Sequence, residues 1–136
     1  MSTVDPSGDE VEIRALIERQ FASLSWTPQS SADWDGFAAD FLPDARLWPS
    51  ARPAASCSVD SFVVRMKGLA GGSLLSLQET LAGLEIIVSG NVAVAAAICE
   101  MAENGGLPNR NVEMLLLVKS GGAWRIASQA WDAAAG

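Results

Sequence analysis

The side chains that could carry out chemistry in this chain are carboxylates, guanidinium groups and thiols. The 136 residues contain no histidine and no tyrosine, but they include 16 Asp and Glu, nine Lys and Arg, and two cysteines. Histidine is the side chain that most often exchanges protons near neutral pH. A general base in this protein is therefore expected to be a carboxylate, and apolar surroundings would raise its pKa to a useful range.

Asp44, Arg46 and Trp48 alternate along a short segment that follows Pro43. Side chains two residues apart lie on one side of a strand, so we expect these three to share a face. Asp44 is a candidate general base, oriented by Arg46, with Trp48 walling an apolar pocket. The competing interpretation is structural: Asp44 accepts hydrogen bonds from backbone N–H groups, and Arg46 pairs with it.

Two more polar groups lie in the last third of the chain. Arg110 and Asp132 are candidates for an ion pair between strands, which either binds the polar end of a ligand or only joins the strands. Glu100, Glu113 and Gln129 are expected to form a row in which two neighbouring carboxylates could share a proton. The competing interpretation of this row is a solvated or interfacial surface.

The elements that position these groups follow from apolar spacing, which is helical in the first half and strand-like in the second. The spacing predicts three helices, at about 13–24, 34–41 and 59–66. It also predicts a short strand at about 45–48. Four longer strands are expected, joined by turns that contain Gly, Asn or Ser, at about 77–89, 92–102, 110–119 and 123–132. The predicted fold class is α+β, with three N-terminal helices packed on a curved, mostly antiparallel sheet. One domain is expected over residues 1–136, with a core of about 10–132.

The pairing of the strands decides which face each polar side chain occupies. Symmetric loops set Glu100 opposite Glu113 and Glu113 opposite Gln129, on one face of the sheet. The other face carries Arg110 and Asp132 at one end and an apolar wall that includes Met101, Met114 and Leu116. A slip of one residue exchanges the faces. In that case the glutamate row would enter the cavity and become the leading catalytic candidate.

Composition favours a globular protein that does not bind nucleic acid. Hydrophobic residues make up 49% of the chain and the formal net charge is −7 at pH 7, whereas phosphate backbones need a basic face. No export signal is visible, and the longest apolar run, 92–99, is too short to span a bilayer. We therefore expect a cytoplasmic protein without a membrane partner. No metal or other cofactor is expected, because there is no histidine, Cys57 and Cys99 are well separated, and no phosphate-binding glycine loop is present.

Three short strings resemble segments of one protein superfamily. Residues 41–45, Phe-Leu-Pro-Asp-Ala, resemble an F-x-P-D-A segment, residues 89–93, Ser-Gly-Asn-Val-Ala, resemble a turn between strands, and residues 121–126, Gly-Gly-Ala-Trp-Arg-Ile, resemble a final D-G-x-W-x-I hairpin. Together with the order of the elements, they resemble the SnoaL-like branch of the nuclear transport factor two-like superfamily over about residues 10–132. The resemblance implies a cone-shaped domain that encloses a pocket for a small hydrophobic molecule and assembles as a homodimer through the outer sheet face. It also implies that the face with Glu100, Glu113 and Gln129 points outward and that the helices cover the face with Arg110 and Asp132.

The catalytic residues of that superfamily are incomplete here. Its dehydratases use a histidine base, and its isomerases use a tyrosine and an aspartate before a proline, where this chain has Trp48 before Pro49. The position of the isomerases' second aspartate falls near Met114. We expect a domain that binds a small hydrophobic molecule; whether it is an enzyme stays open. A cyclase, isomerase or hydrolase of this kind would work through Asp44 or Asp132. The expected ligand-binding residues are Trp34, Arg46, Trp48, Met101, Arg110, Met114, Leu116 and Ser128. The alternative is a non-catalytic ligand-binding or dimeric assembly domain.

Overall fold

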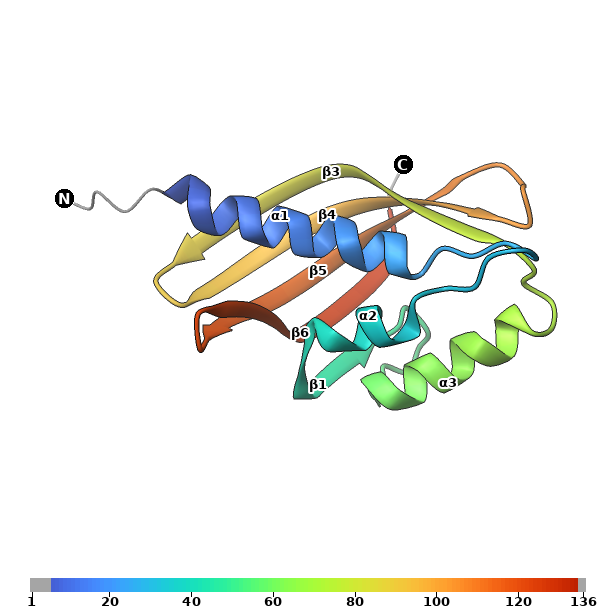
Figure 1. Ribbon diagram of the computed structural model, residues 1–136, viewed down its shortest axis with the longest axis horizontal. Helices are drawn as coiled ribbons and strands as arrows, with labels where there is room; N and C mark the ends of the chain where they lie inside the picture. Colours follow the sequence, from blue (N-terminus) through green and yellow to red (C-terminus); the bar gives the residue numbers. More distant parts are fainter. Residues whose placement is uncertain (1–5, 135–136) are drawn as a thin grey trace.

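A curved sheet of six strands is the main layer of the computed structural model, which describes residues 6–134 (Figure 1). The strands are β1 (Phe41–Trp48), β2 (Cys57–Ser58), β3 (Leu77–Ser89), β4 (Val92–Glu103), β5 (Asn109–Ser120) and β6 (Ala123–Ala133). Their order across the sheet is β2-β1-β6-β5-β4-β3, and only the β1–β6 pair is parallel. Strands β3 to β6 form the predicted antiparallel meander, and each of their ends lies within one residue of its predicted position.

Three helices accompany the sheet in the described part of the chain: α1 (Pro6–Ser23), α2 (Trp34–Ala39) and α3 (Val59–Ala70). Helix α1 lies across one face of the sheet and packs on β3, while α2 and α3 lie together near β1 (Figure 1). The α1 side chains Ile13, Leu16 and Ile17 are fully or almost fully buried, because their spacing places them on one stripe of the helix. None of the helices within residues 6–134 combines the length and apolarity that a bilayer crossing requires.

Helix α2 is shorter than predicted, and β1 begins four residues earlier than predicted. The cause lies at Asp40, which follows the helix and is 6% exposed. The Arg19 guanidinium on α1 donates two hydrogen bonds to the Asp40 carboxylate, at 3.1 and 2.8 Å. The backbone N–H of Ile126 donates to the Asp40 carbonyl at 2.8 Å. These contacts fasten the chain between α1 and β6, so Phe41 continues in β1 and not in the helix.

The predicted pairing of β4 with β5 is wrong by three residues. Cys99 lies opposite Asn111 and not Met114, and Glu100 lies opposite Arg110 and not Glu113. Strand β4 continues to Glu103, and a tight turn follows in which Gly106 N–H donates to the Glu103 carbonyl at 2.9 Å. The centre of this turn lies nearer to β4 than a symmetric loop would place it. The symmetric loop assumed from the sequence therefore predicted the wrong β5 partner for each β4 residue. A shift by an odd number exchanges the faces.

The pairing of β5 with β6 differs from the prediction by two residues, with Glu113 opposite Trp131. The hairpin closes over only Gly121 and Gly122, whose φ angles are 60° and 80°, which is the geometry of a two-residue turn with positive φ at both positions. The β5–β6 register is irregular between Leu116 and Leu117. Before Leu117, the β5 residues pair two positions further along β6 than predicted. Because two is an even number, the predicted faces of β5 and β6 still match each other.

The sheet therefore has an inner face, on the side of α1, and an outer face. The inner face carries buried side chains from β4 to β6, including Ala97, Cys99, Glu113, Leu115, Leu117, Ile126 and Gln129. The outer face carries exposed ones: Ile87, Val94, Met114 and Leu116. The shift has the same parity as the one-residue slip that the sequence left open, so Glu113 and Gln129 point inward. Glu100, the third member of the predicted row, is on the outer face.

Candidate functional site

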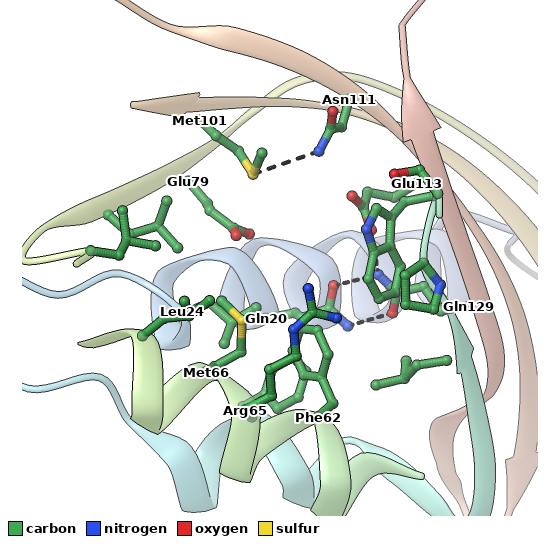
Figure 2. Close-up of a pocket in the computed structure, with 18 of the residues that line it drawn as sticks. Gln20, Leu24, Phe62, Arg65, Met66, Glu79, Met101, Asn111, Glu113 and Gln129 are labelled. Carbon is green, nitrogen blue, oxygen red and sulfur yellow. Dashed lines mark hydrogen bonds between the residues drawn. The ribbon is translucent and has the colours of Figure 1, made fainter. Parts of the chain in front are cut away.

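A cavity of about 250 Å³ lies between the inner face of the sheet and helices α1 and α3 (Figure 2). Most of its lining is apolar: Leu24, Phe37, Leu47, Phe62, Met66, Leu69, Leu74, Leu77, Met101 and Trp131. The polar side chains in the wall are fewer: Gln20, Ser50, Arg65, Glu79, Glu103, Asn111, Glu113 and Gln129. An apolar hollow with a few polar groups is the usual composition of a site for a small molecule.

Aromatic contacts fix the position of α3 over the cavity. The ring of Phe62 on α3 stacks on Phe37 of α2 with centroids 5.6 Å apart, and meets Trp131 of β6 edge-on at the same distance. The helix begins at a cap in which the Ser58 hydroxyl accepts a hydrogen bond from Ser61 N–H at 3.1 Å. These contacts set the next turn of α3 so that Arg65 and Met66 line the cavity.

Glu113 is a buried carboxylate in the wall of this cavity, with 8% of the residue exposed. Gln129 Nε2, on the neighbouring strand β6, donates a hydrogen bond to Glu113 Oε1 at 2.8 Å. Burial raises the pKa of Glu113 to about 7, and the hydrogen bond from Gln129 opposes that rise. The group can therefore exchange a proton near neutral pH.

Glu79 is the second carboxylate, and it reaches the cavity from β3. Figure 2 shows it entering from the side opposite Glu113. Burial and the nearby Glu113 charge raise the pKa of Glu79 to about 8, while a hydrogen bond from Cys99 opposes the rise. The Cys99 Sγ lies 3.9 Å from Glu79 Oε1. At pH 7 the Glu79 side chain is mostly a neutral acid, which can donate a hydrogen bond as well as accept one.

Cys99 lies beneath this pair and remains a thiol. It is fully buried, and burial together with the two glutamates raises the pKa of the thiol far above neutrality. Because the thiolate is the reactive form of cysteine, this residue is a core side chain and not a nucleophile. Cys99 and Cys57 are both free cysteines.

Met101 is the predicted ligand-binding residue that lines the cavity. It lies opposite Glu79 in the β3–β4 pair, and its Sδ accepts a weak hydrogen bond from Asn111 Nδ2 at 3.7 Å. The predicted wall residues Met114, Leu116 and Ser128 instead line a shallow apolar groove on the outer face. The three-residue shift of β5 against β4 is the physical reason for this correction.

The triplet on β1 alternates as predicted but does not reach the cavity. Asp44, Arg46 and Trp48 are all exposed, and Arg46 lies beside Ser128 on the outer face. The Arg46 guanidinium donates to the hydroxyl of Ser56 at 3.0 Å and to its carbonyl at 3.2 Å, so its partner is not Asp44.

The predicted Arg110–Asp132 ion pair does not form. The guanidinium of Arg110 lies 3.5 Å from the Glu100 carboxylate, and Asp132 lies 3.8 Å from Arg52. Their expected alignment required Arg110 to lie opposite Asp132, whereas Val112 occupies that position.

Trp34 belongs to a different surface. Its ring packs against Trp26 at 5.6 Å, beside a groove between the α1–α2 connection and the end of α3. The aromatic residues that line the cavity are therefore Phe37, Phe62 and Trp131.

Several residues of the site were missed by sequence reasoning, among them Gln20 and Glu79. The signal for Glu79 was present in its strand: it interrupts an inward apolar alternation between Leu77 and Leu81. A charged residue at an inward position is costly unless it has a purpose or a partner. Gln20 lies beside the apolar stripe of α1, and only the fold shows that its partner is on β6.

No cluster of three or more Cys, Asp or Glu side chains suited to a metal ion occurs among residues 6–134. Arg65 is the positively charged side chain in the cavity wall, and it is exposed at the rim. The chemistry that the described wall can supply is hydrogen bonding and proton transfer by Glu79 and Glu113, with Gln20, Asn111 and Gln129 around them.

Solved structures with the same fold are numerous, although no family model and no curated protein matches the sequence. An NTF2-like protein of unknown function from Pseudomonas putida superposes with a TM-score of 0.76 at 18% identity, over 96% of this chain and 89% of the other. A cystatin-like protein of unknown function from Nostoc punctiforme gives 0.74 at 14% identity, over 94% and 92%. A proposed scytalone dehydratase from Novosphingobium aromaticivorans gives 0.75 at 13% identity, over 95% and 86%. The chain therefore has the α+β, NTF2-like fold, which confirms the fold that the sequence resemblance implied. A shared fold does not assign a reaction.

Proposed function

We propose that the cavity binds a small, mostly apolar molecule with one carbonyl group, and that Glu79 and Glu113 move protons on it. The observation that carries the proposal is the presence of two carboxylates in one apolar cavity, half-buried Glu79 and buried Glu113, with raised pKa values of about 8 and about 7. The volume of about 250 Å³ exceeds the roughly 150 Å³ of an apolar cavity that binds benzene. A molecule of one or two rings fits this size.

The two glutamates have different roles in this proposal. Glu79, neutral at pH 7, donates a hydrogen bond to the carbonyl oxygen of the ligand, as buried carboxylic acids with raised pKa values can do. Glu113 in its ionised form removes a proton from the carbon next to the carbonyl. The C–H electron pair moves toward the carbonyl oxygen and gives an enolate or enol, which Glu79 stabilises. In a ligand with a carbon–carbon double bond next to the deprotonated carbon, the enolate extends over that bond, and return of the proton to its far carbon completes an isomerisation.

Related reactions use the same base. If the ligand carries a second carbonyl, the enolate carbon can attack it, as in a cyclase. In a hydrolase the base takes its proton from water and not from carbon. A pKa near the working pH favours each of these roles for Glu113.

The test uses 2-tetralone, a bicyclic ketone, in D₂O. We expect the wild-type protein to accelerate deuterium exchange of the C1 protons, measured by ¹H NMR. Glu113→Gln should lower the protein-catalysed rate at least about 10²-fold, the range for loss of a general base. Glu79→Leu should lower it about 10²-fold, whereas Glu79→Gln should retain more, because an amide N–H can still donate.

Asp44→Asn and Asp132→Asn are the matched controls, since both carboxylates are exposed outside the cavity. Both variants should exchange 2-tetralone at the wild-type rate. A loss of activity in either of them, with Glu113→Gln unaffected, would transfer the catalytic role to the outer carboxylates and overturn the proposal.

The alternative is a binding protein without catalysis. The absence of histidine and tyrosine from the chain favours it. Under this alternative, calorimetry would detect binding of 2-tetralone to the wild-type protein, but the exchange rate would equal the rate without protein. Failure to bind the ketone at all would contradict the proposed ligand class.

We also propose that two copies pair through the outer face of the sheet. Ile87, Val94, Met114 and Leu116 are 69%, 47%, 54% and 45% exposed there, and all four line one continuous apolar groove with Ala96 and Ala130. A two-fold pair buries the same patch on both copies. A second copy is the partner that always carries a matching surface.

A further inference from the structure

Gln20 and Gln129 form a reciprocal pair of side-chain amides beside Glu113. Gln20 Nε2 donates to Gln129 Oε1 at 2.8 Å, and Gln129 Nε2 donates back to Gln20 Oε1 at 3.0 Å. The two residues are 1% and 5% exposed, and they join α1 to β6. Figure 2 shows this pair behind α3, next to the end of the Glu113 side chain.

The pair restricts how the Gln129 amide can face Glu113. Each side-chain amide has two N–H donors on one atom and an acceptor oxygen on the other. Gln129 Nε2 uses one donor for Gln20 and the other for Glu113 Oε1, at 2.8 Å. If Gln129 alone turned by 180°, nitrogen would face nitrogen and oxygen would face oxygen across the pair. Two lost hydrogen bonds in a buried site make this orientation costly.

We infer that Gln20 is a positioning residue that holds the Gln129 nitrogen toward Glu113 and leaves Glu113 Oε2 as the oxygen that exchanges protons. A proton on Oε1 would point at an N–H donor and would have no acceptor there. The inference deepens the proposed function, because it explains which oxygen of the base is available. It does not require that the cavity catalyse a reaction.

Other charged or titratable groups face this part of the cavity and enter its pH dependence. They come from three elements: Arg65 on α3, Glu79 on β3, and Cys99 and Glu103 on β4. Each of them is unchanged in a variant at position 20. A difference in the titration midpoint of Glu113 between the wild type and such a variant therefore reports the effect of the amide pair.

The first measurement is made on the wild-type protein. Side-chain amide signals of Gln20 and Gln129 are followed by ¹H–¹⁵N NMR from pH 5 to 9. Both should shift with one midpoint, that of the Glu113 carboxyl carbon followed by ¹³C NMR, because the amides form one chain with the carboxylate. The exposed Gln78 on β3 is the control and should not follow this midpoint.

The second measurement uses Gln20→Met, which keeps the volume of the side chain and removes the amide. Gln129 can then turn and accept a hydrogen bond from a protonated Glu113, so the midpoint of Glu113 should rise by about one pH unit, equivalent to about 1.4 kcal/mol. Ser23→Ala is the matched control on α1: Ser23 is also buried, but its hydroxyl donates to the Gln20 backbone carbonyl. It should leave the midpoint unchanged.

The outcomes separate this inference from the proposed function. A midpoint of Glu113 that is the same in Gln20→Met and wild type, or Gln20 signals that do not titrate in the wild type, overturns the positioning role. A shifted midpoint in a protein that does not accelerate exchange of 2-tetralone supports the positioning role and removes the proposed catalysis. If Gln20→Met does not fold, the wild-type titration alone decides the question.

Discussion

Two glutamates determine the chemistry of the cavity because neither has a cationic partner in an ion pair among the described residues. A buried carboxylate without such a partner adjusts by keeping its proton. By contrast, Asp9 near the start of α1 accepts hydrogen bonds from Trp124 and Lys119, both at 3.0 Å, and these lower its pKa. The cavity is therefore the place where this acidic protein holds protons at neutral pH.

The first prediction concerns stability and pH. The pKa of Glu79 is raised from 4.5 to about 8 by burial and by Glu113. Between these two values the folded protein binds more protons than the unfolded chain, so the free energy of unfolding falls as the pH rises through this interval. Glu79→Gln removes the effect. We expect the variant to be more stable than the wild type by about 2–4 kcal/mol at pH 9 and by less than about 1 kcal/mol at pH 5.

Urea denaturation at the two pH values measures this difference. Glu85→Gln is the control, since Glu85 is exposed and points to the outer face from the same strand. It should change the unfolding free energy by less than about 0.5 kcal/mol at either pH. Equal stability of Glu79→Gln and wild type at pH 9 would mean that Glu79 ionises freely and that water fills the site.

At the scale of elements, turn geometry separates what the sequence predicts from what it does not. The strands were predictable because apolar alternation and Gly-containing turns define their ends. Their pairing was not predictable, because it depends on which residues form each turn. In the β5–β6 turn these are only Gly121 and Gly122, since Ser120 already pairs with Ala123. A single displaced turn after Glu103 moved Glu113 from the expected outer face to the cavity. Gln20 could not be assigned, since its partner is 109 residues away.

The second prediction tests a contact that holds one of these turns. Asn104 follows β4 with a φ of 51°, in the left-handed region that asparagine tolerates better than alanine. Its Oδ1 accepts from the N–H groups of Leu75 and Ser76 at 2.8 and 3.2 Å, and its Nδ2 donates to the Ser73 carbonyl at 3.0 Å. Asn104→Ala loses all three bonds and strains the backbone. We expect a loss of about 2–4 kcal/mol in unfolding free energy.

The control for this prediction is Asn91→Ala, in the turn between β3 and β4. Among the described residues, the Asn91 side chain takes part in no hydrogen bond, and only its backbone carbonyl accepts one, from Lys119. Its replacement should cost less than about 1 kcal/mol. If the two alanine variants unfold at the same urea concentration, the Asn104 side chain does not fasten the β4–β5 turn to the segment before β3.

At the scale of the whole molecule, the two faces of one sheet have different tasks. The inner face meets α1, α2 and α3 and closes around the cavity. The outer face meets no helix in the described residues, although it is as rich in aliphatic side chains as many interfaces. Large exposed apolar patches usually mark contact sites. The register of the strands sets both properties together, because each residue that leaves the outer face joins the inner face.

The last prediction concerns this outer face. In a two-fold pair, a charge at the centre of the patch meets its own copy and loses water on both sides. Met114→Glu and Leu116→Glu should therefore sediment as monomers at about 50 μM, whereas we expect the wild type to sediment as a dimer of two 14.2 kDa chains. Val64→Glu is the control, because Val64 is 69% exposed on α3, outside the outer face, and it should remain a dimer.

Glutamate at 114 or 116 leaves the cavity wall intact, so exchange of 2-tetralone should persist in the monomers. A wild-type protein that is monomeric at this concentration, or glutamate variants that still pair, would contradict the proposed interface.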